Sequence, residues 1–367
     1  MFYDYLIVGA GFSGTVLAER LASRANKKVC IIDKRNHIGG NSYDCFDETG
    51  ILIHKYGPHW FHTNSDDVYN YLSKFTQWIE HKHIIKSNLN GKLFPFPINI
   101  DTINSFFNVE LKTGNDAKDF IGKKKIEIRN PKNAEEMVLS LLGKELYKAF
   151  YENYTIKQWN IHPKDLSASI TARIPVRYDN RDSYFNDKYQ LMPKNGYTAI
   201  FEKMLDHKNI SLFLDTDFND LSNDVKYDKL IYTGPIDEFF GNCFGELPYR
   251  SLRFEHQAIK KEFYQECQQI NYPNENNFTR IVEWKHATGQ KSDITSIMRE
   301  YPVKYESGME KFYPIPFAEG NEILLKYKDK SKDHKNAIFC GRLAEYKYYN
   351  MDQVVAQSLK IFNRLVY

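Results

Sequence analysis

The first residues whose types and spacing can do chemistry are three glycines near the N-terminus, Gly9, Gly11 and Gly14, in the pattern GxGxxG. They follow a short apolar run and precede a helical pattern, the context in which this spacing binds a dinucleotide. Gly9 permits a tight turn, Gly11 lets the backbone approach a pyrophosphate, and Gly14 lets helix and strand pack closely. With Phe12 and Ser13, they open a helix whose first N–H groups can bind the anion. The sequence therefore predicts a dinucleotide cradle.

A second set of candidates follows the next apolar run. Asp33 is placed to hydrogen-bond a ribose diol, and Lys34 comes directly after it. A glycine doublet, Gly39-Gly40, then precedes Asn41. A doublet at this place resembles the FAD folds of the amine-oxidase and GDP-dissociation-inhibitor superfamily, where it lets the backbone pass close to the cofactor. This resemblance implies FAD rather than NAD, while a plain surface turn is the alternative for the doublet taken alone.

The elements that must position these residues form a βαβ unit. Residues 5–8 and 29–32 are short apolar runs typical of buried parallel strands. Val16, Leu17 and Leu21 fall on one face of the helix expected between them. Because a parallel strand pair needs a crossover connection, strand, helix and strand form one unit.

The remaining pattern predicts an α/β fold with a Rossmann-type FAD-binding domain, an inserted helical domain and a second, antiparallel or mixed sheet. We expect helices over 133–151, 196–205 and 351–366, and strands over 210–214, 230–232, 252–263, 278–284 and 337–342. The expected domains are a discontinuous FAD-binding domain of residues 1–75, 195–240 and 318–367, a helical cap domain of residues 76–150, and a substrate-binding sheet domain of residues 151–194 and 241–317.

The composition of this 367-residue chain limits the kinds of partner that it is expected to bind. A net charge of +3, from 50 Lys and Arg against 47 Asp and Glu, argues against nucleic acid or an anionic membrane surface. The five cysteines lack CxxC spacing, which indicates thiols rather than disulfides or a metal site. The sequence shows no signal peptide and no run of 18 apolar residues, so we expect a cytoplasmic protein without membrane insertion. The 26 tyrosines favour a polar pocket lined with rings.

Eight ordered motifs together resemble the UDP-galactopyranose mutase family over essentially the whole chain. They are RNHIGGN (35–41), HKYGPHWFHTN (54–64), YTIKQW (154–159), RIPVRY (173–178), YTGPID (232–237), YRSLRFE (249–255), FTRIVEWKH (278–286) and GRLAEYKYYNMDQ (341–353). An ordered series of this kind is far more specific than any one motif.

The resemblance assigns roles to arginines. Arg173 and Arg280 match positions that grip the two phosphates of a UDP-sugar, and the planar guanidinium suits bidentate binding of phosphate oxygens. The matches at Arg250 and Asn271 imply support at the same place. Structural ion pairs are the alternative for any one of these arginines.

The resemblance also assigns roles to aromatic residues. A platform for stacking uracil is implied for Phe150, Tyr154, Trp159, Tyr184 and Phe185. Tyr313 and Tyr348 match tyrosines that contact the diphosphate, to which a phenol can donate a hydrogen bond. Ordinary core packing is the alternative for each stacking residue taken alone.

The loop opened by Gly57-Pro58 carries His59 and His62, which do not have the spacing of a zinc site. In the family this loop passes under the flavin near N5, which implies cofactor contact for His59 and a catalytic role for His62; a packed or solvated histidine is the alternative. Arg342 and the residues that open the last helix would face the flavin pyrimidine ring and stabilise its reduced form. These opening residues are Met351, Asp352 and Gln353.

The implied reaction is a ring contraction of a nucleotide-diphospho-hexose from pyranose to furanose, without net redox change. In the family, N5 of reduced FAD attacks the anomeric carbon and expels the diphosphate, and the resulting flavin-sugar adduct opens and recloses through the 4-hydroxyl. Arg173 and Arg280 would stabilise the departing diphosphate. A homodimer is expected.

The sequence departs from the family where the sugar should lie. Pro58 and Trp60 interrupt a loop that usually reads GAHIFHT, Trp284 stands where the family often has His, and His83 stands where Asn is expected. UDP-galactose is the first expectation for the substrate, and dTDP-fucose and UDP-N-acetylgalactosamine are alternatives. A flavin oxidase and a non-enzymatic binding protein of the GDP-dissociation-inhibitor type are rivals from other classes.

Overall fold

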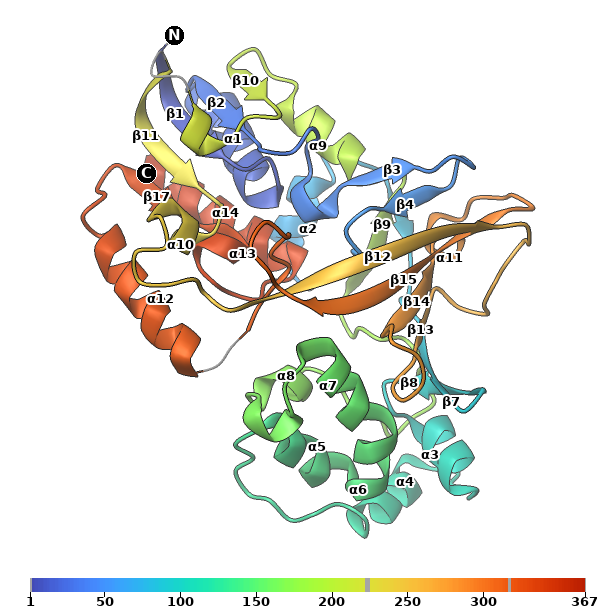
Figure 1. Cartoon of the computed structure of the whole chain (residues 1–367). Coiled ribbons are helices and arrows are strands. Elements are labelled where there is room, and N and C mark those ends of the chain that lie inside the picture. The colour runs from blue at the N-terminus through green and yellow to red at the C-terminus, as the bar shows by residue number, and fades with distance from the viewer. Residues whose placement is uncertain (1, 222–224, 316–317, 367) are drawn as a thin grey trace. The chain divides into compact units, whose positions relative to one another are not determined.

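The structure is a computed structural model that describes residues 2–221, 225–315 and 318–366 (Figure 1). The chain forms two units. The first comprises Met1–His81, Asp187–Pro248 and Ala318–Tyr367, and the second comprises Lys82–Asn186 and Tyr249–Phe317. The three-part division expected from the sequence stays a prediction.

A five-stranded parallel sheet organises the first unit. Its strand order is β10 (Ile210–Phe213), β2 (Val29–Ile32), β1 (Phe2–Val8), β11 (Lys226–Tyr232) and β17 (Ala337–Phe339). Helix α1 (Phe12–Ala25) connects β1 to β2, which confirms the predicted βαβ unit. The strand predicted over 337–342 is shorter, because Gly341 already begins helix α13 (Gly341–Ala344).

Both faces of this sheet are covered, as buried parallel strands require. On one face, Leu17 of α1 and Phe362 of α14 (Met351–Val366) belong to one core cluster with Ile7 and Ile31. On the other face, Leu6 and Tyr232 share a cluster with Phe218 and Phe239. The Rossmann-type fold predicted from the sequence is therefore present.

Smaller elements complete the first unit. Strands β3 (Asp44–Phe46) and β4 (Leu52–His54) form a hairpin, and β5 (Phe61–Thr63), β9 (Tyr189–Pro193) and β6 (Trp78–Glu80) form an antiparallel sheet in that order. The remaining helices are α2 (Asp66–Leu72), α9 (Thr198–Leu205), α10 (Ile236–Phe239) and α12 (Ala318–Ser331).

A seven-stranded mixed sheet organises the second unit. Its order is β16 (Tyr313–Pro314), β12 (Tyr249–Ile259), β15 (Thr295–Lys304), β14 (Arg280–Glu283), β13 (Gln269–Asn271), β7 (Ile85–Leu89) and β8 (Lys92–Phe96). Only β13 and β7 run parallel among these neighbours. Strands β12 and β15 form a long antiparallel pair, and the short helix α11 (Lys285–Thr288) follows β14 (Figure 1).

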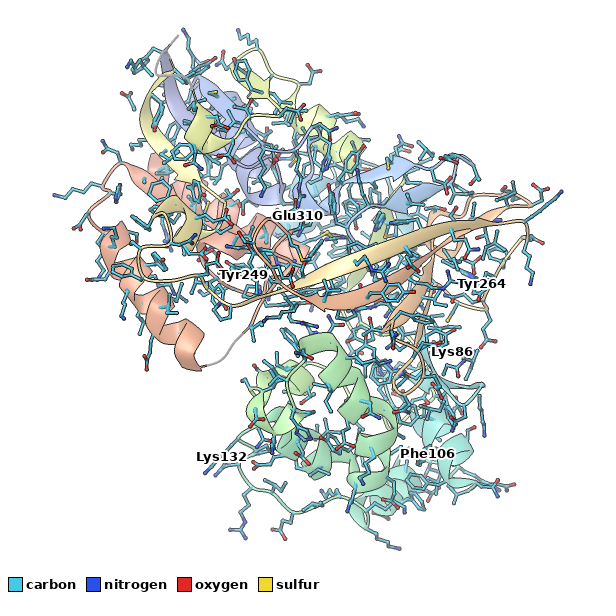
Figure 2. The ribbon with its side chains drawn as sticks, viewed as in Figure 1. Lys86, Phe106, Lys132, Tyr249, Tyr264 and Glu310 are labelled. Atoms are coloured by element: carbon cyan, nitrogen blue, oxygen red, sulfur yellow. The ribbon has the colours of Figure 1, made fainter. Side chains whose placement is uncertain are left out.

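A group of helices follows strand β8 along the chain. They are α3 (Ile100–Phe107), α4 (Gly114–Gly122), α5 (Ala134–Leu142), α6 (Lys144–Leu146), α7 (Asn153–Trp159) and α8 (Ser169–Ala172). Phe106, labelled in Figure 2, packs edge-on against Phe94 with ring centroids 6.1 Å apart. These rings belong to the buried core of the helical part.

The single helix predicted over 133–151 is wrong. Gly143 ends α5 with φ 81°, and a Cβ there would lie 2.3 Å from the carbonyl oxygen of Lys124. A π-helical segment, Tyr147–Glu152, then leads into α7. The apolar spacing continues through this break, so periodicity alone could not show it.

Within the described residues, the structure contains no helix of the length and apolar character needed to cross a membrane.

Candidate functional site

The predicted cradle lies between the end of β1 and the start of α1. Gly9 has φ +104°, and a Cβ there would lie 2.1 Å from Oγ1 of Thr233. A Cβ on Gly14 would lie 1.9 Å from the carbonyl oxygen of Gly9. Since neither position has room for a side chain, these two glycines are required by the packing of the turn itself.

Gly11 lacks a side chain for a different reason. Its backbone angles, φ −81° and ψ −174°, suit any residue, and the nearest atom to a Cβ there would be Cα of Gly40 at 3.7 Å. No side chain caps α1 at this residue. The space beside Gly11 and the N–H groups of the first turn, which includes Phe12 and Ser13, therefore suit an anionic group.

Asp33 and the glycine doublet shape the same turn. Asp33 Oδ2 accepts a hydrogen bond from the Ala10 N–H at 2.8 Å, and Oδ1 accepts one from the Arg35 N–H at 2.9 Å. The Gly39 N–H donates to the carbonyl of Ala10 at 2.9 Å. The Asp33 carboxylate thus holds the cradle, and its contact with a ribose stays a prediction.

The doublet needs glycine, because both residues have positive φ, 92° at Gly39 and 56° at Gly40. Asn41 accepts a hydrogen bond from Arg35 Nη2 at 2.9 Å, and Lys34 is exposed. The doublet, which first indicated FAD, packs directly against the GxGxxG turn. The residues present therefore fit the pyrophosphate of a dinucleotide.

The histidine loop holds His59 in its neutral form. Burial, together with the nearby charge of Arg342, lowers the pKa of His59 to about 4. Its Nδ1 lies 2.9 Å from the carbonyl of Gly57, and its backbone N–H donates to His54 Nδ1 at 3.0 Å. A neutral imidazole held in this way can accept or donate a hydrogen bond without adding charge.

His62 has an acidic partner that the sequence did not reveal. Its Nδ1 lies 3.0 Å from Asp187 Oδ2, while Asn64 donates to Asp187 Oδ1 at 2.8 Å. A carboxylate at Nδ1 orients the ring and favours the tautomer with the proton on that nitrogen. Asp187 is 125 residues from His62 in sequence, so no local pattern could have linked them.

Trp60 lies inside the first unit, with 9% of its surface exposed. Its ring packs against His54 at 5.7 Å and His81 at 5.4 Å between centroids. Trp60, which departs from the family pattern of this loop, thus packs at a tilt between two histidine rings. Its predicted role beside the sugar stays a prediction.

The start of the last helix is tied to neighbouring elements of the first unit. Asp352 Oδ2 accepts a hydrogen bond from Thr63 Oγ1 at 3.0 Å, and Met351 Sδ accepts one from Ser42 at 3.7 Å. Gln353 Oε1 accepts one from the Asn350 N–H at 2.9 Å.

Before this helix, the Arg342 guanidinium lies 5.1 Å from the ring centroid of Tyr348, a cation–π contact. Tyr348 is 43% exposed. The structure therefore brings together these two predicted residues, one assigned to the cofactor and one to the diphosphate.

In the second unit, Arg280 is held by two neighbours that the sequence did not predict. Its Nη2 lies 2.9 Å from Oε1 of Glu300, which is 1% exposed, and 3.5 Å from Oε1 of Gln158. Strand pairing sets Arg280 directly opposite both Glu300 and Asn271. Arg280 therefore forms the structural ion pair that was the alternative to phosphate binding. The same ion pair with Glu300 fixes the position of the Arg280 guanidinium.

Tyr154 lies close to these charges. Burial raises its pKa to about 12, and it senses Arg280, Glu300, Tyr184 and Arg173 electrostatically. Arg173 is exposed and directly follows α8. Both predicted phosphate-binding arginines thus act electrostatically on one predicted stacking ring.

A second group surrounds His83, which is 2% exposed. Its ring centroid lies 5.8 Å from that of Tyr184 and 5.7 Å from that of Phe185, and its Nδ1 lies 3.0 Å from Gln268 Nε2. Arg177 Nη2 donates to the carbonyl of Tyr184 at 3.1 Å, which fixes the segment that carries both aromatic rings. Arg177 belongs to the motif RIPVRY, but its role depends on a fold contact that the motif does not show.

Other predicted substrate residues lie elsewhere in the second unit. Phe150 packs in the helical core, with its ring 5.6 Å from that of Phe94, and Trp159 is 5% exposed beside Tyr313 at 6.2 Å. Trp284 is 1% exposed and stacks on His256 at 6.4 Å. For these residues the core-packing alternative describes the observed contacts, and their substrate roles stay predictions.

Comparisons with known proteins agree with this arrangement. The family model of UDP-galactopyranose mutase matches residues 149–348, and that of the NAD(P)-binding Rossmann-like domain matches residues 7–75. A probable UDP-galactopyranose mutase from Klebsiella pneumoniae is 41% identical over 361 residues, covering 97% of this chain and 93% of the relative. A dTDP-fucopyranose mutase from Escherichia coli is 37% identical, covering 97% of this chain and 96% of the relative.

Solved structures share the fold. A crystal structure of reduced UDP-galactopyranose mutase superposes with a TM-score of 0.78 at 18% identity, covering 99% of this chain and 95% of that one. A putative protoporphyrinogen oxidase from Exiguobacterium gives 0.69 at 12% identity, covering 99% and 98%. Since oxidases share the fold, the fold alone does not separate a mutase from an oxidase. The sequence relationship does, and the chain belongs to the UDP-galactopyranose mutase family of isomerases.

Proposed function

We propose that this enzyme interconverts the pyranose and furanose forms of a nucleotide-diphospho-hexose, with UDP-galactose as the first candidate. The observation that carries the substrate class is the cluster around Tyr154, a partly buried ring on which Arg280, Tyr184 and Arg173 act electrostatically. A nucleotide diphosphate presents a flat base and two charged phosphates, and the cluster offers a ring and two cations.

FAD is the cofactor that suits the first unit. The open space at Gly11, the uncapped start of α1 and the packed doublet Gly39-Gly40 fit its pyrophosphate. When bound and reduced, FAD supplies a nucleophilic nitrogen for the anomeric carbon of the sugar.

The chain's own residues then have three tasks. The N–H groups of α1 and the glycine turn hold the pyrophosphate, while Asp33 keeps that turn in place. Neutral His59 and the N-terminus of α14 provide hydrogen-bond donors and a positive dipole end for the flavin ring. Arg173 and Arg280 neutralise the diphosphate as it leaves and hold it for recapture.

A second candidate substrate is dTDP-fucose. The 37% identical relative from Escherichia coli is named dTDP-fucopyranose mutase, and the chain has Trp60 in the loop expected near the sugar. Fucose carries a methyl group at C6 where galactose has a hydroxymethyl group, and an indole favours contact with a methyl group. The apolar indole of Trp60, which packs at a tilt against His54 and His81, is the feature that favours this candidate.

A panel of sugars tests the proposal. Purified enzyme is incubated with UDP-galactose, UDP-N-acetylgalactosamine and dTDP-fucose, with and without dithionite, and the products are separated by chromatography. We expect one hexose to yield a furanose only after reduction. If no member isomerises under reduction, the proposed reaction is wrong; oxygen uptake with substrate loss would support an oxidase instead.

We also propose that the enzyme acts in the cytoplasm as a homodimer. All five cysteines are free thiols, which suits a reducing compartment. Light scattering coupled to gel filtration measures the assembly, and a mass of one chain at all concentrations would contradict the dimer. Fractionation of cells tests the location.

A further inference from the structure

Two cations, the partly buried Lys157 and the buried Arg250, fasten helix α7 through backbone carbonyl groups. The Lys157 ammonium donates to the carbonyls of Glu275 at 3.1 Å, Phe278 at 3.2 Å and Asn276 at 3.4 Å, and also to that of Tyr272. From the sheet, Arg250 Nε donates to the carbonyl of Gln158 at 3.2 Å and Nη2 to that of Lys157 at 3.4 Å. Arg250 thereby satisfies carbonyls that the end of a helix leaves without partners.

The helix presents different faces to these attachments and to Arg280. Residues four apart lie on one face of a helix, so Asn153 and Lys157 share a face, and Tyr154 and Gln158 share another. Asn153 Nδ2 donates to Asn274 at 3.0 Å, which belongs to the same segment that surrounds the Lys157 ammonium. The attachment therefore sets the rotation of α7, which places Tyr154 and Gln158 toward Arg280.

Carbonyl groups hold both cations without neutralising them. Neither Lys157 nor Arg250 forms an ion pair with a carboxylate of the described residues, although Glu275 acts on Lys157 at longer range. Burial lowers the pKa of Lys157 to about 8 and also lowers that of Arg250, so each charge carries a desolvation cost. A carboxylate partner would offset that cost, but its negative charge would repel a diphosphate nearby.

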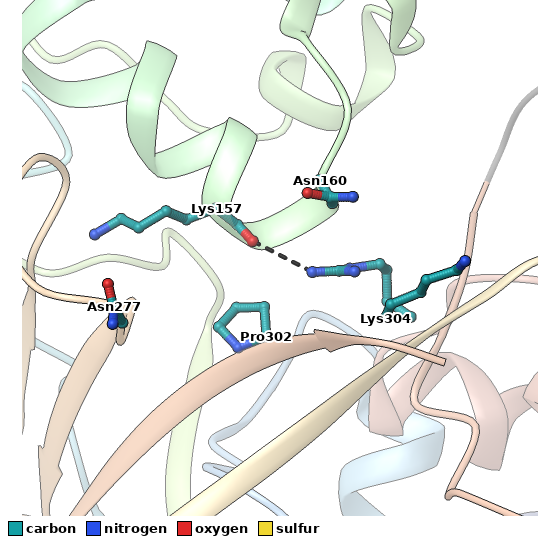
Figure 3. A pocket seen from close by; sticks show the side chains of 6 residues that line it. Lys157, Asn160, Asn277, Pro302 and Lys304 are labelled. Carbon is teal, nitrogen blue, oxygen red and sulfur yellow. Dashed lines mark hydrogen bonds between the residues drawn. The ribbon is translucent and has the colours of Figure 1, made fainter. Parts of the chain in front are cut away.

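The residues that line a cavity beside Lys157 and Arg250 add positive charge and no negative charge. The cavity, of about 240 Å³, is lined by Lys157, Asn160, Arg250, Asn277, Pro302 and Lys304. Figure 3 shows this lining and the hydrogen bond to the Lys157 carbonyl. Three of the lining residues are cationic and none is acidic, so the charge at this end of α7 is positive.

We propose that Lys157 and Arg250 are positioning residues of the nucleotide site. They fix α7 so that Tyr154 and Gln158 face Arg280, and their charge, held by carbonyl dipoles and not by a paired carboxylate, adds to the attraction for a nucleotide diphosphate. The inference rests on the proposed function, because it assigns the charge to diphosphate binding.

A matched control exists in the same unit. The Lys285 ammonium also lies among carbonyls, with Glu262 at 2.7 Å and Ile294 at 3.2 Å, and the residue is 2% exposed. Its partners come just after β12 and just before β15, at the end of this strand pair where Ile259 faces Thr295, whereas Arg250 pairs with Lys304 at the other end. Nine residues of strand separate the two ends, about 30 Å. Lys285→Met removes a similar caged charge far from α7.

The experiment compares affinities for UDP and for uridine, which lacks the diphosphate. Wild type, Lys157→Met, Arg250→Met and Lys285→Met are titrated with each ligand by calorimetry, and thermal unfolding is recorded. We expect Lys157→Met and Arg250→Met to lose roughly tenfold in UDP affinity, with a smaller loss for uridine. Lys285→Met should bind both ligands like wild type, and Arg250→Lys, which keeps the charge, should retain most of the UDP affinity.

The outcomes separate this inference from the proposed function. If wild type binds no nucleotide diphosphate, the proposed function is wrong, and the inference fails with it. If wild type binds UDP and both Lys157→Met and Arg250→Met bind it equally well, only the inference is wrong. If Lys157→Met and Arg250→Met lose affinity for UDP and uridine equally, the two residues position α7, but the electrostatic part of the inference is wrong. If Lys285→Met loses as much UDP affinity as the other two variants, the loss reflects the general stability of the second unit, and the inference is wrong. Should Lys157→Met fail to fold, Lys157→Gln and Arg250→Met decide the result.

Discussion

A methyl group at Gly11 should block the cofactor without harming the fold, whereas one at Gly14 should harm both. At Gly11, φ −81° and ψ −174° suit alanine, and the nearest atom to the new Cβ would lie 3.7 Å away. At Gly14 the Cβ would lie 1.9 Å from the carbonyl oxygen of Gly9 and 3.0 Å from Ile7 Cγ2. The two substitutions add the same group to one turn, so they separate the needs of the ligand from those of the protein.

The magnitudes follow from these contacts. In the absence of flavin, Gly11→Ala should leave the free energy of unfolding unchanged or raise it by about 0.5 kcal/mol, because alanine restricts the unfolded chain. Its methyl group would separate the backbone from the pyrophosphate and remove a charge-assisted hydrogen bond of about 1.5–3 kcal/mol, a loss of roughly 10- to 150-fold in FAD affinity. Gly14→Ala should destabilise the apoprotein by about 2 kcal/mol or more, since a backbone oxygen cannot rotate away.

The assay uses both variants as apoproteins. Chemical denaturation gives the free energy of unfolding, and flavin fluorescence during titration gives the dissociation constant for FAD. The reasoning is refuted if Gly11→Ala binds FAD like wild type, or if its apoprotein is as unstable as that of Gly14→Ala.

Three further predictions concern single side chains. Arg280→Ala should lower kcat by about 10²–10³ and leave the protein yellow, because Arg280 belongs to the second unit whereas the glycine cradle is built by the first; turnover assays and the flavin spectrum check this, and loss of colour would contradict it. Glu300→Gln should lower the free energy of unfolding by about 3 kcal/mol, because it removes the buried partner of Arg280; denaturant melts measure the change, and a loss under 1 kcal/mol would mean the pair is weak. The pKa of His59 is about 4 in the fold against 6.5 in the unfolded chain, so the unfolded state takes up the proton first and stability falls as pH drops from about 6.5 to 4. His59→Gln should flatten Tm over that range, and an unchanged slope would contradict the assignment.

Local chemistry made the cradle predictable from sequence. Gly9, Gly11 and Gly14 lie within one turn, and the apolar runs on either side are the strands and helix that position them. The predicted helix over 133–151 was wrong because of a contact that is not local in sequence. Its apolar spacing continues through Gly143, but a contact with the distant Lys124 carbonyl requires the break there.

The partners of the functional side chains could not be predicted, because pairing between distant strands and loops selects them. Glu300 meets Arg280 only through the register of β14 and β15, and Asp187 meets His62 through a loop far along the chain. The family resemblance predicted substrate-binding roles for Tyr154 and Arg173, and in the structure Arg173 acts electrostatically on Tyr154. The resemblance predicted no role for Lys157 or Arg177, whose partners are backbone carbonyls.

The most direct test of the central claim is the conversion of UDP-galactopyranose by one preparation of enzyme, measured by chromatography before and after reduction with dithionite. The proposed reaction predicts no product from the oxidised enzyme and UDP-galactofuranose from the reduced enzyme, with no net consumption of reductant per turnover. Isomerisation at equal rates in both redox states, or product formation that consumes reductant stoichiometrically, would contradict it.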